Sequence, residues 1–131
     1  MSRRQVEVSA SDPERASATF AEMGTYRVLI FLAPAEGCEA EFHEWYEHTH
    51  LDEVLATAGF SNAQRFGLEL STGVDAPGGH LAVYESEGDS ATEVLERLAS
   101  TRDQRSYPEV ADASRSAIWV FSPLGELHQA E

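Results

Sequence analysis

The order of strand-like and helix-like segments along the chain is the feature that most constrains its fold. Short apolar or alternating segments typical of strands lie at residues 26–33, 61–70, 80–85 and 117–122. Helical spacing of apolar residues runs over residues 39–58. A second helix is predicted from Ser90, which forms a capping box with Glu93, to Ala99. The predicted order is therefore strand, helix, strand, strand, helix, strand.

That order is the split βαβ arrangement of the ferredoxin-like α+β folds, and it predicts a four-stranded antiparallel sheet with both helices on one face. We expect this domain to span residues 25–122. Residues 1–24 are polar with little periodicity and are expected to form a mobile arm, and residues 123–131 a polar tail. For the long polar stretch over residues 100–116 we expect a loop with a short helix from Pro108.

Both faces of the predicted sheet are apolar, because apolar side chains fill successive positions of residues 26–33 and of residues 117–122. Two helices cover only one of these faces. An uncovered apolar face is a surface for a partner, and the simplest partner is a second copy of the chain. We therefore expect a homodimer whose sheets face each other around a partly enclosed space. The alternative is that the N-terminal arm covers this face, with Phe20 and Met23 among its few apolar residues.

Residues 42–60 place aromatic, histidine and acidic side chains in one helix-length segment that ends at Gly59. At about 100° per residue, the apolar residues before Glu47 lie on one face and those after it lie on nearly the opposite face. These two groups are Phe42, Trp45 and Tyr46, and Leu51, Val54, Leu55 and Ala58. One straight helix cannot bury both groups, so we expect a kink, a break or a change of buried face between Glu47 and Leu51. His50 lies within that interval.

The same segment and the strand after it resemble the EthD-like group of the dimeric α/β-barrel superfamily. Members of that group often show W-Y-x-x-x-H at the end of the first helix and P-G-F before the second strand. This chain departs from the pattern at Asp52 and Ala58, where proline is common in the group. The residues that carry the resemblance are Trp45, Tyr46, His50, Leu51, Glu53, Val54, Gly59, Phe60, Ala63, Arg65 and Phe66.

The resemblance implies a ferredoxin-like fold, a dimer and a pocket between the sheet and the helices. It also places the recurring histidine of the group at His50. Relatives in the group include polyketide cyclases, muconolactone isomerases, dehydratases and cofactor-independent monooxygenases, so the resemblance by itself does not select one reaction.

His50 is the candidate catalytic residue, because a neutral imidazole beside an apolar pocket is a competent general acid or base. The alternative is a buried histidine that binds a backbone carbonyl freed by the kink. Arg65 is a candidate for stabilising negative charge on a substrate, and its alternative is an ion pair with Glu69 or an acid across the strands. Four aromatic residues are candidates for lining the pocket, and core packing is their alternative. They are Trp45, Tyr46, Tyr84 and Trp119.

Composition excludes several classes of function. The chain carries 23 acids and 9 Lys+Arg, all of them arginine, for a net charge of −14. The absence of lysine excludes Schiff-base chemistry and a Walker phosphate loop, and the acidic charge disfavours nucleic-acid binding. The single cysteine, Cys38, excludes an internal disulfide. With no apolar run long enough for a membrane span and no secretory signal, we expect no membrane association and a cytoplasmic location.

Motifs for a metal or a cofactor are also missing. After His43, the next histidine, His48, stands one place too late for an HExxH zinc motif. No G-x-G-x-x-G or G-x-S-x-G sequence occurs. We therefore expect no cofactor, no metal and chemistry limited to proton transfer.

The leading hypothesis is a cofactor-independent cyclase, isomerase or dehydratase that acts on an aromatic, polyketide-like or lactone substrate. One alternative is a non-catalytic dimeric protein that binds a small hydrophobic or aromatic molecule or serves as an accessory protein. A second alternative is a cofactor-free monooxygenase of the same architecture.

Overall fold

The computed structural model describes residues 24–131. Its strands and helices are β1 (Gly24–Pro34), α2 (Glu39–Trp45), η1 (Tyr46–His50), α3 (Leu51–Ala58), β2 (Asn62–Gly67), β3 (His80–Gly88), α4 (Ala91–Ser100), η2 (Arg102–Gln104) and β4 (Ala111–Phe121). The strands form one antiparallel sheet in the order β2-β3-β1-β4. This α+β architecture is compatible with the predicted ferredoxin-like fold.

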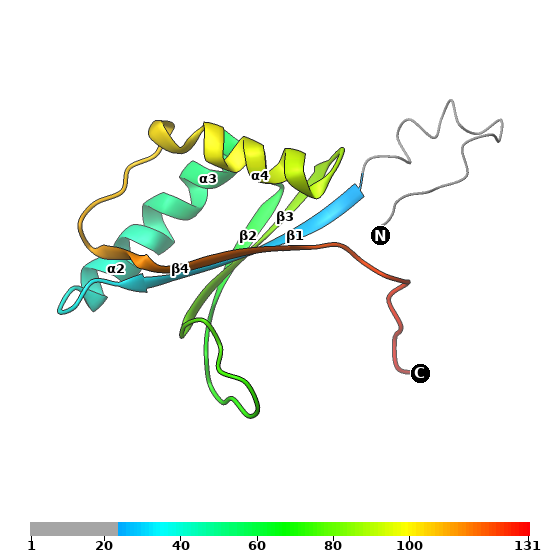
Figure 1. Ribbon diagram of the computed structural model, residues 1–131, viewed down its shortest axis with the longest axis horizontal. Helices are drawn as coiled ribbons and strands as arrows, with labels where there is room; N and C mark the ends of the chain where they lie inside the picture. Colours follow the sequence, from blue (N-terminus) through cyan, green and yellow to red (C-terminus); the bar gives the residue numbers. More distant parts are fainter. Residues whose placement is uncertain (1–23) are drawn as a thin grey trace.

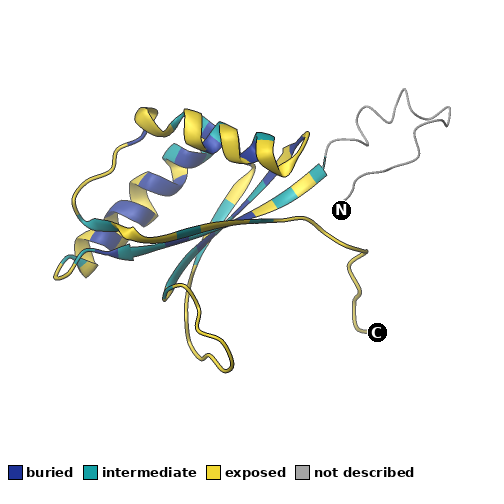
Figure 2. Ribbon diagram, in the orientation of Figure 1, coloured by how far each residue is buried: buried dark blue, intermediate teal, exposed yellow. Residues whose placement is uncertain are grey.

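The helices lie on one side of the sheet, as Figure 1 shows, and no helix of residues 24–131 lies on the other side. Tyr84 on β3 and Val28 on β1 face the helices and are fully buried. Figure 2 shows the buried residues concentrated where the helices face the sheet. The layer between the sheet and the helices is therefore the hydrophobic core.

The helix over residues 39–58 contains a π-helical turn at Tyr46–His50, where the N–H of Leu51 bonds to the C=O of Tyr46. One residue more per turn rotates the helix relative to the sheet. Phe42 on α2 and Val54 on α3 consequently both face the core, and each is at most 1% exposed. The predicted change of buried face between Glu47 and Leu51 is confirmed, and the π turn is its cause.

The predicted helix ends are also confirmed. Gly59 follows α3 with a left-handed φ of 72°, a conformation that glycine adopts without steric strain, and its N–H bonds to Leu55 at 3.1 Å. At the start of α4, the Ser90 hydroxyl accepts the N–H of Glu93 at 3.1 Å.

Strand β4 begins at Ala111, six residues before the predicted start, so the prediction of a loop with a helix from Pro108 is wrong. Pairing with β1 explains the difference. Ala111 pairs with Pro34 and Asp112 with Ala33, and the register shifts before Ser116 pairs with Leu32. Backbone hydrogen bonds to a neighbouring strand hold this polar segment in the sheet despite its weak strand propensity.

The predicted arm at residues 1–24 lies outside the described residues except for Gly24, the first residue of β1. Residues 123–131 contain no helix or strand. Within residues 24–131, no helix has the length and apolar character needed to cross a membrane.

We expect Phe42→Ala to lower the free energy of unfolding by about 3–5 kcal/mol. Phe42 is 0% exposed and packs edge-on against the Tyr46 ring at 5.5 Å, so truncation leaves a cavity where π-turn and sheet residues meet. Urea denaturation measures the change, with Glu44→Ala on the exposed side of α2 as the control. A loss below about 1 kcal/mol would show that this ring is not a core residue.

Candidate functional site

A cavity of about 450 Å³ lies between the sheet and the helices at the end where β4 begins. Residues from β1, η1, α3, α4, β4 and the loop before β4 line it. Its apolar walls include Ile30, Leu32, Val54, Leu98 and Ile118. Its polar lining includes His50, Arg102, Arg105, Tyr107 and Glu109. Apolar walls with a few polar groups on one side are typical of a small-molecule site.

The π turn places His50 in this cavity. In a π turn, residues five apart lie one above the other, and the imidazole of His50 consequently stacks on Trp45 with ring centroids 4.4 Å apart and an angle of 26°. Tyr46 at 4.9 Å and Tyr107 at 5.1 Å meet the imidazole edge-on. Three aromatic rings therefore fix the orientation of an imidazole that is only 4% exposed.

The His50 imidazole is neutral at pH 7. Burial lowers its pKa from the usual 6.5 to about 4, and Arg105 adds to the lowering, whereas Glu53 opposes it. Its Nδ1 atom has no hydrogen-bond partner among residues 24–131. The predicted alternative, a ring bound to a backbone carbonyl, does not occur at this nitrogen. The ring is therefore uncharged at neutral pH, and its Nδ1 is buried without a hydrogen-bond partner in the described part of the chain.

Glu53, one turn further along the helix, brings a carboxylate to the imidazole. Its Oε1 lies 3.7 Å from Nδ1 of His50. The carboxylate is held by Ser106, whose N–H and hydroxyl both donate to it at 3.2 Å. The Ser106 hydroxyl in turn accepts the indole N–H of Trp45 at 3.4 Å. A carboxylate placed in this way stabilises an imidazolium that forms by proton uptake.

Tyr46 and Tyr84 form a second buried polar group in the core. Neither hydroxyl has a hydrogen-bond partner among the described residues. Burial raises the pKa of Tyr46 to about 12, and burial likewise raises the pKa of Tyr84 well above its usual value. Both phenols consequently stay protonated at neutral pH. Neither residue is part of the cavity lining, although Tyr46 packs against His50.

The remaining predicted site residues lie away from the cavity. Arg65 faces the helices, where it donates to Glu47 at 3.2 Å and to Nδ1 of His43 at 2.7 Å, so its partner is Glu47 rather than Glu69. Trp119 lies on the opposite face of the sheet, edge-on to Phe31 at 5.1 Å. Of the six predicted residues, only His50 lines the cavity, and Trp45 and Tyr46 support its ring.

The sequence pattern did not indicate Glu53 as a partner of His50, and it did not indicate the two cavity arginines that follow α4, Arg102 and Arg105. The polar stretch that holds Arg102, Arg105 and Tyr107 carries no periodic signal. Among these residues, only Glu53 had a signal in the sequence, because it stands three residues after His50 and thus lies on the same side of a helix.

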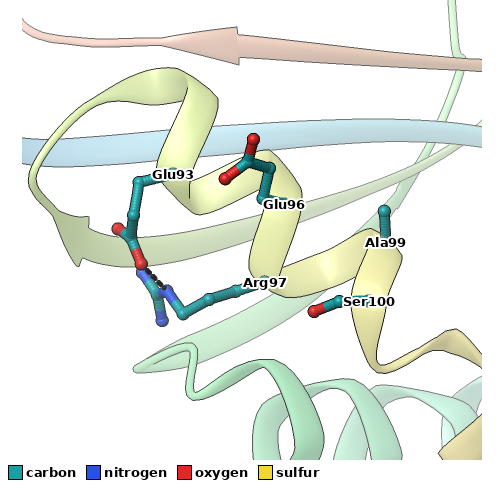
Figure 3. Close-up of a pocket in the computed structure, with 5 residues that line it drawn as sticks. All are labelled: Glu93, Glu96, Arg97, Ala99 and Ser100. Carbon is teal, nitrogen blue, oxygen red and sulfur yellow. Dashed lines mark hydrogen bonds and ion pairs between the residues drawn. The ribbon is translucent and has the colours of Figure 1, made fainter.

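No group of three or more histidine, cysteine, aspartate or glutamate side chains is placed to hold a metal ion in the part of the chain that the structure describes. A second surface depression, of about 570 Å³, lies along α4 and is shown in Figure 3. Arg97 and Glu93 in this depression pair with each other at 2.8 Å, and Glu96 is an exposed carboxylate. The depression therefore holds no buried titratable side chain comparable to His50.

Comparison with protein-family models, with curated proteins and with solved structures gives no match to this chain.

The lowered pKa of His50 predicts a pH-dependent contribution to stability. The unfolded chain takes up a proton as the pH falls through 6.5, whereas the folded protein does not until the pH approaches 4. The contribution of the neutral His50 to the free energy of unfolding is therefore fully present above pH 6.5, and about 3 kcal/mol of it is lost between pH 7 and pH 4. Urea denaturation of the unchanged protein and of His50→Gln should show that the difference between their free energies of unfolding changes by this amount. A difference that stays constant over this range would contradict burial of a neutral imidazole.

Proposed function

We propose that this protein is a cofactor-independent proton-transfer enzyme, a cyclase, isomerase or dehydratase, that acts on an aromatic, polyketide-like or lactone substrate. The observation that carries the proposal is the buried, neutral His50 in the wall of an apolar cavity of about 450 Å³. Burial of such an imidazole is unfavourable, and its Nδ1 makes no hydrogen bond among the described residues that would offset this cost.

In this proposal His50 takes a proton from a C–H that a neighbouring carbonyl makes acidic. The electron pair of that bond stays on the substrate as an enolate, and the proton resides on the imidazole until it returns to another atom of the product. Glu53 stabilises the imidazolium, and Ser106 holds Glu53 in place. The apolar walls favour flat carbon rings.

Hydrogen–deuterium exchange tests this proposal before the substrate is known. Aromatic ketones and unsaturated lactones, whose carbonyl makes a neighbouring C–H acidic, are incubated with the protein in D₂O. Loss of the C–H signal is followed by NMR. The proposal expects accelerated exchange with at least one of these compounds. A protein that binds such compounds without accelerating exchange is the binding protein of the alternative hypothesis. That outcome would overturn the enzymatic proposal.

We further propose that the active form is a homodimer joined through the helix-free face of the sheet. This open face carries exposed aromatic side chains, with Trp119 43% exposed, Phe66 47% and Phe121 52%, and it also carries the Arg27–Glu85 ion pair. Leu81 and Val83 on β3 lie on the same face, in register with Phe66 and Gln64. A face of this character is stabilised when a second copy covers it. The resemblance to the EthD-like group stays a prediction that this dimer would support.

A further inference from the structure

The two arginines that line the cavity differ from the other arginines of residues 24–131 because they form no ion pair with an acid. Four of the six arginines within residues 24–131 form an ion pair with an acid, namely Arg27, Arg65, Arg97 and Arg115. The other two are Arg102 and Arg105, and in the described part of the chain no carboxylate oxygen lies within 4.0 Å of their guanidinium nitrogens. Both line the cavity beside His50.

Arg105 is a buried cation, with 7% of its surface exposed. Its guanidinium donates only to uncharged acceptors: the Leu98 carbonyl at 2.7 Å, the hydroxyls of Thr57 and Thr101 at 2.8 Å each, and the Tyr107 hydroxyl at 3.1 Å. These bonds fix its position without neutralising its charge. A buried charge without a counter-ion is unfavourable, so a structural role alone does not account for it.

Arg102 completes a cationic wall. Its guanidinium lies over the Tyr107 ring at 4.1 Å, and Tyr107 contacts both Arg105 and the imidazole of His50. Glu109 also lines the cavity but is not paired with either arginine. Since the chain as a whole carries a net charge of −14, this wall is an exception to its surroundings.

We propose that the cavity takes an organic acid, an aromatic or lactone molecule whose carboxylate binds Arg105 and Arg102 while its carbon skeleton lies on the apolar walls beside His50. The guanidinium fork of Arg102 matches a planar carboxylate. Four of the five N–H groups of Arg105 already donate to protein acceptors, so Arg105 adds its charge and its one remaining N–H. The apolar lining favours an organic acid over inorganic phosphate. The inference rests on the proposed function in naming this acid a substrate, and it specifies the chemical class of that substrate.

Calorimetric titration with 2-naphthoate and with its neutral counterpart 2-naphthamide tests the inference without any turnover. We expect 2-naphthoate to bind about tenfold or more tightly, because a charge-assisted bond exceeds a neutral one by at least that factor. Arg105→Gln and Arg102→Gln should each remove most of this preference. Arg27→Gln removes the same charge from the open face, away from the cavity, and should preserve it.

Several results would overturn the inference: equal affinity for the two compounds, no binding of 2-naphthoate up to about 10 mM, or equal losses in Arg102→Gln and Arg27→Gln. If Arg105→Gln does not fold, Arg102→Gln at its exposed position decides the matter. Titration of His50→Gln separates this inference from the proposed function. If His50→Gln keeps the preference for 2-naphthoate while the unchanged protein accelerates no C–H exchange, the anion site is supported and the catalytic role of His50 is rejected.

Discussion

His50→Gln is expected to lower the rate of ligand C–H exchange by about 10²- to 10⁴-fold, the usual contribution of a positioned general base. Glutamine is polar and of similar size, but it does not accept a proton at neutral pH. Binding of the ligand should change little, because the apolar walls and the arginines of the cavity remain. The loss should therefore fall on the exchange rate at saturation rather than on the dissociation constant.

His48→Gln provides the matched control for this experiment. His48 belongs to the same π turn as His50, but its side chain is exposed. The control should exchange ligand protons at the rate of the unchanged protein. If His50→Gln retains its fold by circular dichroism and still exchanges at that rate, His50 is not the base.

Trp119→Glu is expected to convert the proposed dimer into monomers. In a two-fold symmetric interface each substitution acts twice, and the loss of a central tryptophan costs about 2 kcal/mol or more per copy. The dissociation constant should therefore rise about a thousandfold or more. Sedimentation equilibrium measures the change, with a mass near twice 14.4 kDa expected for the unchanged protein at micromolar concentration.

Ala56→Glu adds the same charge to the exposed side of α3, on the helix side of the sheet, and should leave the dimer intact. A mass of one chain for the unchanged protein would contradict the argument from the open face. A dimer that survives in Trp119→Glu would place the interface elsewhere on the molecule.

The fold was predictable from local pattern because its elements are short and periodic. The conflict between the two apolar faces of residues 39–58 predicted an irregularity, and the π turn resolves it. The start of β4 was not predictable in this way. Residues 111–116 are polar, and only their pairing with β1 makes them a strand.

The candidate site was predictable in part. His50 was found because its type and its place at the irregularity both pointed to it. The face of the sheet that carries Trp119 depends on strand register, which alternation alone does not determine. Arg105 lies 55 positions from His50 in a segment without periodicity, and it reaches the cavity only because the chain returns from α4 to β4.

An NMR titration of the histidine side chains, with His50 assigned by its absence from His50→Gln, examines the basis of the proposal. The account predicts that the His50 imidazole is neutral at pH 7 and titrates with a pKa near 4, and that its resonances shift when 2-naphthoate is added. An imidazole that titrates near 6.5 and does not respond to the ligand would contradict it, because such a ring would face water rather than the cavity.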